Sequence, residues 1–122
     1  MIHGRLDDEL GVWITISVRG AAGAMAVEAM VDTGFTGFLT LPDRIIGALG
    51  LEFYDLVQAT LGDGSATWFL AYKGLVDWDG VTVPVRIDSA ETDPLVGMAL
   101  LEGHALRIAC VPGGEVTIER LP

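Results

Sequence analysis

The segment Ala29–Gly37 has the residue types of a hydrolytic site. An apolar run ends at Asp32, and Thr33 and Gly34 follow directly. A carboxylate can deprotonate a water molecule when a second, protonated carboxyl group lies about 3 Å away, because the two acids then share one proton. Asp32 can equally be a turn residue whose side chain accepts a hydrogen bond from its own backbone. The tripeptide by itself leaves both interpretations open.

Two further segments favour the hydrolytic interpretation. A glycine-bearing turn, Gly62–Ser65, lies between two extended segments, and Leu95–Gly97, two aliphatic residues and a glycine, precedes a helix-like stretch. In order and spacing these parts resemble the retroviral-type (clan AA) aspartic proteases, and more closely their small bacterial single-domain members. The resemblance covers Val12–Leu121. It implies one domain over residues 1–122 and an all-β fold, a closed or sandwich-like retropepsin-type β-barrel with one or two short helices.

The resemblance implies that Asp32 is the catalytic residue and that Thr33 and Gly34 hold its loop. The Thr33 hydroxyl would bond across to a second chain, as the interlocking threonine pair of the family does, and the Gly34 N–H would lie close to the carboxylate. The chain has one Asp-Thr-Gly, and Met98, which follows Gly97, is not an acid. A homodimer is therefore expected, since two copies must each contribute one Asp32.

The resemblance also assigns a flap to the glycine-bearing hairpin turn. The flap residues are Gly62, Asp63, Gly64 and Ser65. A flap opens for an extended peptide and closes over it, which excludes water, although an ordinary surface hairpin explains the same sequence. Val96 and Gly97 correspond to the segment beneath the catalytic loop, where they give structural support and Gly97 allows close approach.

Phe35 departs from the family pattern, which usually has Ser or Ala after Asp-Thr-Gly. A serine there would bond the outer carboxylate oxygen of Asp32, whereas the Phe35 ring has no hydrogen-bonding group. That oxygen is left to Thr36, to water or without a partner. Two rival hypotheses follow. One is a catalytically weak or inactive module that dimerises or binds peptides, and the other is a monomeric acidic β-domain in which Asp32 is only a turn residue.

Hydrophobic periodicity and turn residues predict the elements that position this site. Val12–Val18 alternates with a period of two, which is typical of a strand. Pro42–Leu49 is predicted to be a helix, because Pro42 suits its first turn and Gly50 its end. The terminal segment either pairs between chains or completes the monomer's sheet. About eight strands are expected, drawn from Val12–Val18, Ala24–Val31, Thr36–Leu41, Leu56–Leu61, Thr67–Tyr72, Gly74–Trp78, Val81–Ile87, Leu106–Val111 and Glu115–Leu121, while Leu95–Leu101 is expected to start a short helix.

Charge and composition limit the partners. The chain has 7 basic and 17 acidic residues, a net charge of −10, and its hydrophobic fraction of 51% is enough for a packed core. Nucleic acids and anionic membrane surfaces attract Lys and Arg, so neither is an expected partner. The expected partners are a second copy of the chain and a peptide or unfolded protein substrate, which an aspartic endopeptidase would hydrolyse.

His3, His104 and Cys110 receive no chemical role. The histidines are far apart in sequence and have no cysteine at metal-ligand spacing, so neither a metal nor a cofactor is expected. Cys110 lies in an apolar run, which predicts a buried, inert thiol. No apolar signal core begins the sequence, and no stretch reaches the roughly 18 apolar residues of a membrane span. The cytoplasm is the expected compartment.

Overall fold

The computed structural model describes all 122 residues, and the chain folds mainly into β-strands, which confirms the all-β prediction. Two short helices interrupt the strands. The elements are β1 (Ile2–Leu6), β2 (Val12–Gly20), β3 (Gly23–Val31), β4 (Leu39–Leu41), α1 (Asp43–Leu49), β5 (Glu52–Thr60), β6 (Ala66–Trp78), β7 (Val81–Ser89), β8 (Leu95–Val96), α2 (Met98–Leu101), β9 (His104–Ile108) and β10 (Glu115–Arg120).

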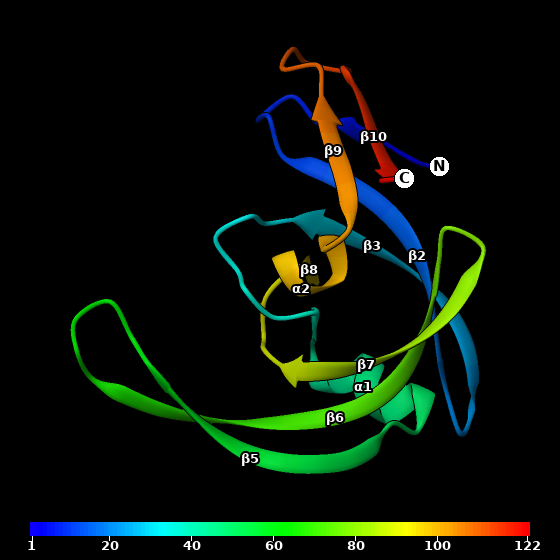
Figure 1. Ribbon diagram of the computed structural model, residues 1–122. Coiled ribbons are helices and arrows are strands. Elements are labelled where there is room, and N and C mark those ends of the chain that lie inside the picture. The colour runs from blue at the N-terminus through cyan, green and yellow to red at the C-terminus, as the bar shows by residue number, and fades with distance from the viewer.

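All the strands belong to one sheet, in the order β5-β6-β7-β4-β8-β3-β2-β1-β10-β9. A further pairing, between β6 and the end of β2, joins the middle of this order into a ring of strands (Figure 1). Strand β5 extends the sheet beyond the ring on one side, and β1, β10 and β9 extend it on the other. Two pairings are parallel, β3 with β8 and β4 with β7.

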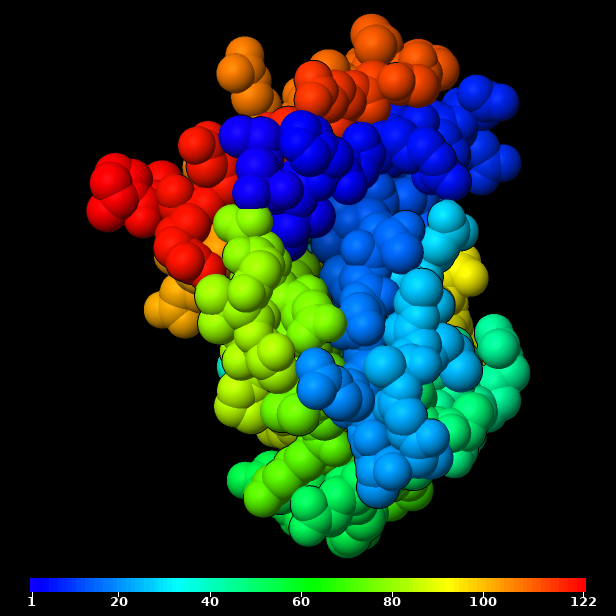
Figure 2. Space-filling view, turned by 90° about the vertical axis from the view of Figure 1, so that its right-hand side faces the viewer, coloured from blue at the N-terminus to red at the C-terminus, as the bar shows by residue number.

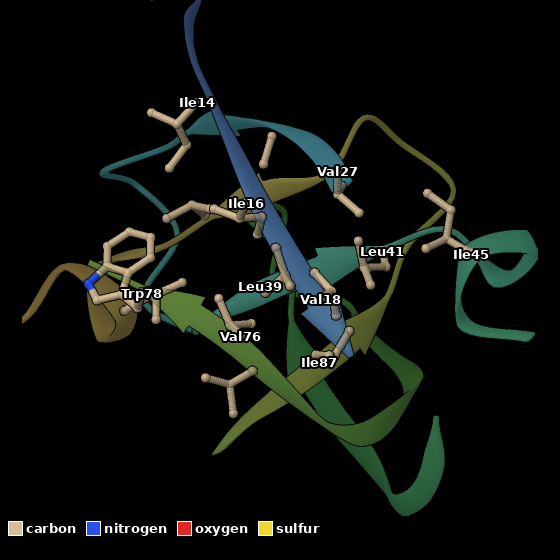
Figure 3. Packing of buried hydrophobic residues seen from close by; sticks show 14 of the residues in the cluster. Ile14, Ile16, Val18, Val27, Leu39, Leu41, Ile45, Val76, Trp78 and Ile87 are labelled. Carbon is tan, nitrogen blue, oxygen red and sulfur yellow. The ribbon is translucent and has the colours of Figure 1, made fainter. Parts of the chain in front are cut away.

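The hydrophobic core fills this ring, and Figure 3 shows buried side chains gathered around β2, one of the strands of the ring. Alternate residues of β2, Ile14, Ile16 and Val18, are buried, which confirms the period of two expected there. Val76 of β6 and Ile87 of β7 belong to the same cluster. Each buried aliphatic side chain of this size stabilises the fold by about 1.5–3 kcal/mol.

Helix α1 begins at Asp43, one residue later than predicted, and Pro42 is its N-cap residue. Gly50 ends it in the left-handed conformation, with φ of 61°, and its N–H bonds to the carbonyl oxygen of Gly47 at 3.1 Å. The buried face of the helix consists of Ile45, Ile46 and Leu49. Neither helix of the fold is long and apolar enough to cross a membrane.

Strand β6 is longer than expected. The sequence predicts two strands that meet near Gly74, whereas the structure has one strand of 13 residues that runs through Gly74 without a break. A Cβ atom on Gly74 would lie 2.7 Å from Cδ1 of Ile87 and 3.0 Å from Cδ2 of Leu51. Gly74 is therefore a close-packing position within the strand rather than a break.

Strand β1 is absent from the predicted elements. It lies between β2 and β10, with Ile2 opposite Ile118 and Leu6 opposite Val12. Figure 2 shows the blue N-terminal residues beside the red C-terminal ones. Because β10 pairs with β1 on one edge and with β9 on the other, the terminal segment completes the sheet of a single chain.

The region around Cys110 also differs from the expectation. The strand predicted over Leu106–Val111 is β9, which ends at Ile108. Cys110 follows in the turn before β10 and is exposed, so the prediction of a buried thiol is wrong. Gly113 in this turn has φ of 73°, a left-handed conformation that glycine adopts without strain.

Candidate active site

Asp32 lies directly after β3, at the start of the loop that leads to β4. The short strand β8 is inserted between these two strands. Val31 at the end of β3 and Leu39 at the start of β4 both pair with Val96 of β8. Two segments that are more than fifty residues apart in sequence thus meet behind the Asp32 loop, which we define as residues 32–38.

Backbone hydrogen bonds hold the Asp32 loop against β8 and α2. The Asp32 N–H donates to the carbonyl oxygen of Val96 at 2.9 Å. From the other segment, the Gly97 N–H donates to Phe38 O at 3.0 Å and the Met98 N–H to Phe35 O at 2.8 Å. The loop is consequently anchored at its beginning, its middle and its end.

The Asp32 carboxylate is turned toward its own loop. The Gly34 N–H donates to Asp32 Oδ1 at 2.9 Å, and a Cβ on Gly34 would lie only 3.2 Å from the same oxygen. Asp32 is half-buried, whereas Thr33 and Gly34 are exposed. The structure therefore brings the three predicted catalytic residues together at the surface, with the carboxylate oriented by a backbone donor.

Gly97 lies under the Asp32 loop at very short range. A Cβ on Gly97 would overlap the carbonyl oxygen of Gly37, and it would lie 2.5 Å from Cδ2 and 2.8 Å from the carbonyl oxygen of Phe35. The Phe35 ring also covers Gly37, where a Cβ would lie 2.5 Å from Cζ. Phe35 thus fills the space between the loop and the segment beneath it.

The predicted flap residues form the turn of the β5–β6 hairpin, which projects beyond the rest of the sheet (Figure 1). Asp63 Oδ1 accepts hydrogen bonds from the Ser65 N–H at 2.9 Å and from the Ser65 hydroxyl at 2.6 Å. These bonds hold the pKa of Asp63 below its usual value. Gly64 has φ of 86°, which favours glycine. Most residues of both arms near the turn are exposed, so the hairpin tip has little burial to stabilise it.

A cavity of about 570 Å³ lies between the Asp32 loop and the β5–β6 hairpin, and we call it the loop–hairpin pocket. Phe35, Thr36 and Gly37 line it from the loop. Apolar residues of the hairpin form another wall, among them Val57 and Phe69. Residues from β4 and β7, together with Ala90 directly after β7, complete the lining. The pocket thus opens beside the loop that carries Asp32.

Two charged residues of β7, Arg86 and Asp88, belong to the loop–hairpin pocket, and the sequence analysis did not identify either of them. Arg86 Nε donates to Asp88 Oδ1 at 3.0 Å. Burial raises the pKa of Asp88 above its usual value, and the adjacent Arg86 guanidinium opposes part of this shift. The sequence does place Arg86 and Asp88 two residues apart, and residues two apart on a strand share one face, so this spacing could have indicated that they form a pair.

The histidines lie elsewhere. His3 Nδ1 is 3.4 Å from Glu115 Oε1 at the surface. The His104 ring packs edge-on against Trp78, with 5.9 Å between centroids, and its Nδ1 faces Glu102 O at 3.0 Å. No group of three or more His, Cys, Asp or Glu residues is placed to bind a metal ion.

No protein-family model, curated protein or solved structure matches this chain. The chemistry of the site follows from its own geometry. A single oriented carboxylate on an anchored, exposed loop can bind or activate a water molecule, and a pocket of about 570 Å³ opens beside the same loop, at Phe35–Gly37. Asp-based hydrolysis needs a second carboxyl group, and the segment beneath the loop, Leu95–Leu101, has no acidic residue.

Proposed function

We propose that this chain is a homodimeric aspartic endopeptidase with a retropepsin-type fold. The observation that carries the proposal is the anchored Asp32 loop. Strand β8 passes between the strands that flank it, and the Gly34 N–H orients the carboxylate at 2.9 Å. The projecting hairpin and the pocket between hairpin and loop also support it, since an extended peptide needs a cleft of this kind beside the reacting group.

The proposed reaction uses one Asp32 from each copy. Two carboxyl groups about 3 Å apart share one proton, because both cannot ionise at that distance. The ionised Asp32 then takes a proton from a water molecule, whose oxygen bonds to the carbonyl carbon, while the protonated Asp32 donates to the carbonyl oxygen. The C–N bond breaks as this tetrahedral intermediate collapses, and the proton taken from water passes to the leaving nitrogen. Thr33 is exposed beside the carboxylate, where its hydroxyl is available to the second copy. The β5–β6 hairpin would close over the substrate.

A peptide-binding or dimerisation module with little or no catalysis is the second candidate. Phe35 favours it, because a phenylalanine at this position has no hydroxyl that could hold the outer oxygen of Asp32. The same pocket and hairpin would then bind a peptide without cleaving it. For either candidate the proposed compartment is the cytoplasm, where the free and exposed thiol of Cys110 would stay reduced.

The test is cleavage of a denatured protein by the purified chain across a range of pH. We expect wild type to cleave and Asp32→Asn, which preserves the size of the side chain, to be inactive. Asp8→Asn is the charge-matched control, since Asp8 is exposed in the turn between β1 and β2, and it should cleave like wild type. Equal cleavage by wild type and Asp32→Asn would reject the proposal.

Mixing separates a shared site from a site within one chain. After subunit exchange between equal amounts of wild type and Asp32→Asn, about a quarter of randomly paired dimers contain two wild-type chains. Activity should therefore fall to about half that of the wild-type chains alone. Activity unchanged by the inactive variant would contradict a site built from two copies. Tight binding of a pepstatin-type inhibitor or peptide without turnover would favour the binding module.

A further inference from the structure

Asp88 is the one carboxylate in the loop–hairpin pocket, and it is more buried than a charged group usually is. Only 7% of the residue is exposed, and burial raises its pKa. Arg86 is the only other charged residue in the lining. The chain thus keeps an acid at a place where ionisation is unfavourable, beside the loop that carries Asp32.

The Asp88 carboxylate has acceptor capacity that Arg86 does not use. Arg86 Nε bonds well to Oδ1 at 3.0 Å, whereas the guanidinium NH2 lies 3.5 Å from Oδ2, at the limit of a hydrogen bond. Oδ2 lies on the side of the Asp32 loop, 3.5 Å from the place that a Cβ on Gly37 would occupy. The Phe35 ring borders Asp88 on this side, because its Cζ lies 2.5 Å from the same place, and a ligand reaches Asp88 through the loop–hairpin pocket that Asp88 lines.

The rest of the lining suits a long aliphatic stem. Val57, Ala59 and Phe69 supply apolar surface from the hairpin arms, while Thr36 and Gln58 are polar but uncharged. A lysine or arginine side chain can bury its methylene groups on such a wall and place its charge against a carboxylate. The Arg86 guanidinium is 39% exposed and already paired, so it has less to gain from a new partner. The net charge of −10 also attracts basic peptides.

We propose that Asp88 makes the loop–hairpin pocket selective for a basic side chain, lysine or arginine, of an extended peptide. The inference rests on the proposed function, because it assumes that an extended peptide binds along the Asp32 loop. An incoming ammonium or guanidinium group donates to Oδ2 and replaces the water that is lost on burial. Asp88 is in this view a specificity-determining residue that does not take part in the chemistry at Asp32.

The experiment uses unstructured peptides that differ at one position, where the residue is Lys, Gln or Glu. This variable position is moved in turn along the peptide, on both sides of the cleaved bond. Values of kcat/KM are measured for wild type, Asp88→Asn and the control Asp8→Asn. Binding of the same fluorescent peptides is measured by anisotropy on the Asp32→Asn background, with and without Asp88→Asn. Thermal unfolding checks that each variant is folded.

The expected result is a preference of about tenfold for Lys over Gln at one position, in cleavage and in binding, because a hydrogen bond to a buried charge discriminates on this scale. Asp88→Asn should remove the preference for Lys over Gln, and Asp8→Asn should retain it. A preference that survives Asp88→Asn would overturn the inference, and so would its absence from wild type. A preference for Glu would assign recognition to Arg86 instead.

The two proposals fail in different ways. Lysine-selective binding that depends on Asp88, without cleavage of any peptide by wild type, would support the pocket and reject the endopeptidase. Cleavage that is indifferent to the Lys, Gln and Glu series would support the endopeptidase and reject the role of Asp88. Neither binding nor cleavage of any peptide would reject both.

Discussion

Replacing Gly97 with alanine should destabilise the fold at the candidate site. The added methyl group would overlap the Gly37 carbonyl oxygen and lie 2.8 Å from the Phe35 carbonyl oxygen. Both are backbone atoms of the Asp32 loop, which four hydrogen bonds fasten to Val96–Ala99, and each of the two oxygens accepts one of these bonds, so neither can move away freely. Overpacking costs about 1–3 kcal/mol, and one weakened backbone hydrogen bond adds about 1 kcal/mol.

The smaller entropy of the unfolded alanine chain offsets about 0.4–1 kcal/mol of this cost. The net loss is therefore about 1–3.6 kcal/mol, or a melting temperature lowered by roughly 4–14 °C for a domain of this size. Thermal and urea unfolding followed by circular dichroism measure it. Faster hydrogen exchange of the Asp32 amide, which bonds to Val96 O, would locate the damage at the loop.

Gly47→Ala is the matched control. Gly47 lies on the exposed face of α1 with nothing within 4 Å of an added Cβ, so alanine there should stabilise the protein by about 0.5–1 kcal/mol. The same substitution should thus have opposite signs at the two positions. A Gly97→Ala protein as stable as wild type would refute the close packing between α2, β8 and the Asp32 loop.

Three further predictions concern acidic residues. Hydrogen bonds from the Trp13 indole and two backbone N–H groups hold the pKa of Asp7 below 3.8, so Asp7→Asn should melt lower than wild type at neutral pH, and the difference should vanish as the pH falls through that lowered pKa. Burial raises the pKa of Asp88, so its ionisation costs stability as the pH rises above 3.8. The melting temperature of Asp88→Asn should therefore rise relative to that of wild type as the pH is raised from about 3 to about 7. Asp63→Ala removes both bonds to Ser65, so limited proteolysis at the hairpin turn should become faster, while an unchanged melting temperature would show that the effect is local.

Local patterns in the sequence predict much of this fold. The alternation in Val12–Val18 predicts β2 because inward residues of a strand must be apolar when one face is buried. Pro42 and Gly50 predict α1 because each matches a geometric need of a helix end. These features depend only on neighbouring residues.

Distant packing decides what the sequence does not predict. Strand β1 contains His3, Gly4 and Arg5, which have weak strand preference, and its place depends on β2 and β10. Gly74 was expected to separate two strands, but the side chains of Ile87 and Leu51 occupy the space a side chain would need. Composition near a glycine does not distinguish a turn from a close contact.

In the candidate site, too, the features set by neighbouring residues are predicted, and those set by distant packing are not. The Asp-Thr-Gly motif indicates the Asp32 loop because a tight turn after a strand needs these residue types. Asp88 was missed because it belongs to a strand rather than to a motif, and only the ring of strands brings it beside Gly37. Membership of a pocket depends on the partners of a strand, which local sequence does not specify.

The insertion of β8 between β3 and β4 has a consequence for the order in which the protein is completed. The Asp32 N–H bonds to the carbonyl oxygen of Val96, and the Thr40 hydroxyl oxygen accepts a hydrogen bond from the Leu95 N–H. More than fifty residues separate the two halves of each pair in sequence. Closing so long a loop is entropically costly, so these contacts should form late in folding. During synthesis, until residue 96 and its neighbours have left the ribosome, the Asp32 loop lacks the backbone hydrogen bonds that anchor it to β8 and α2. The Asp32 loop is thus assembled only when most of the chain is already in place.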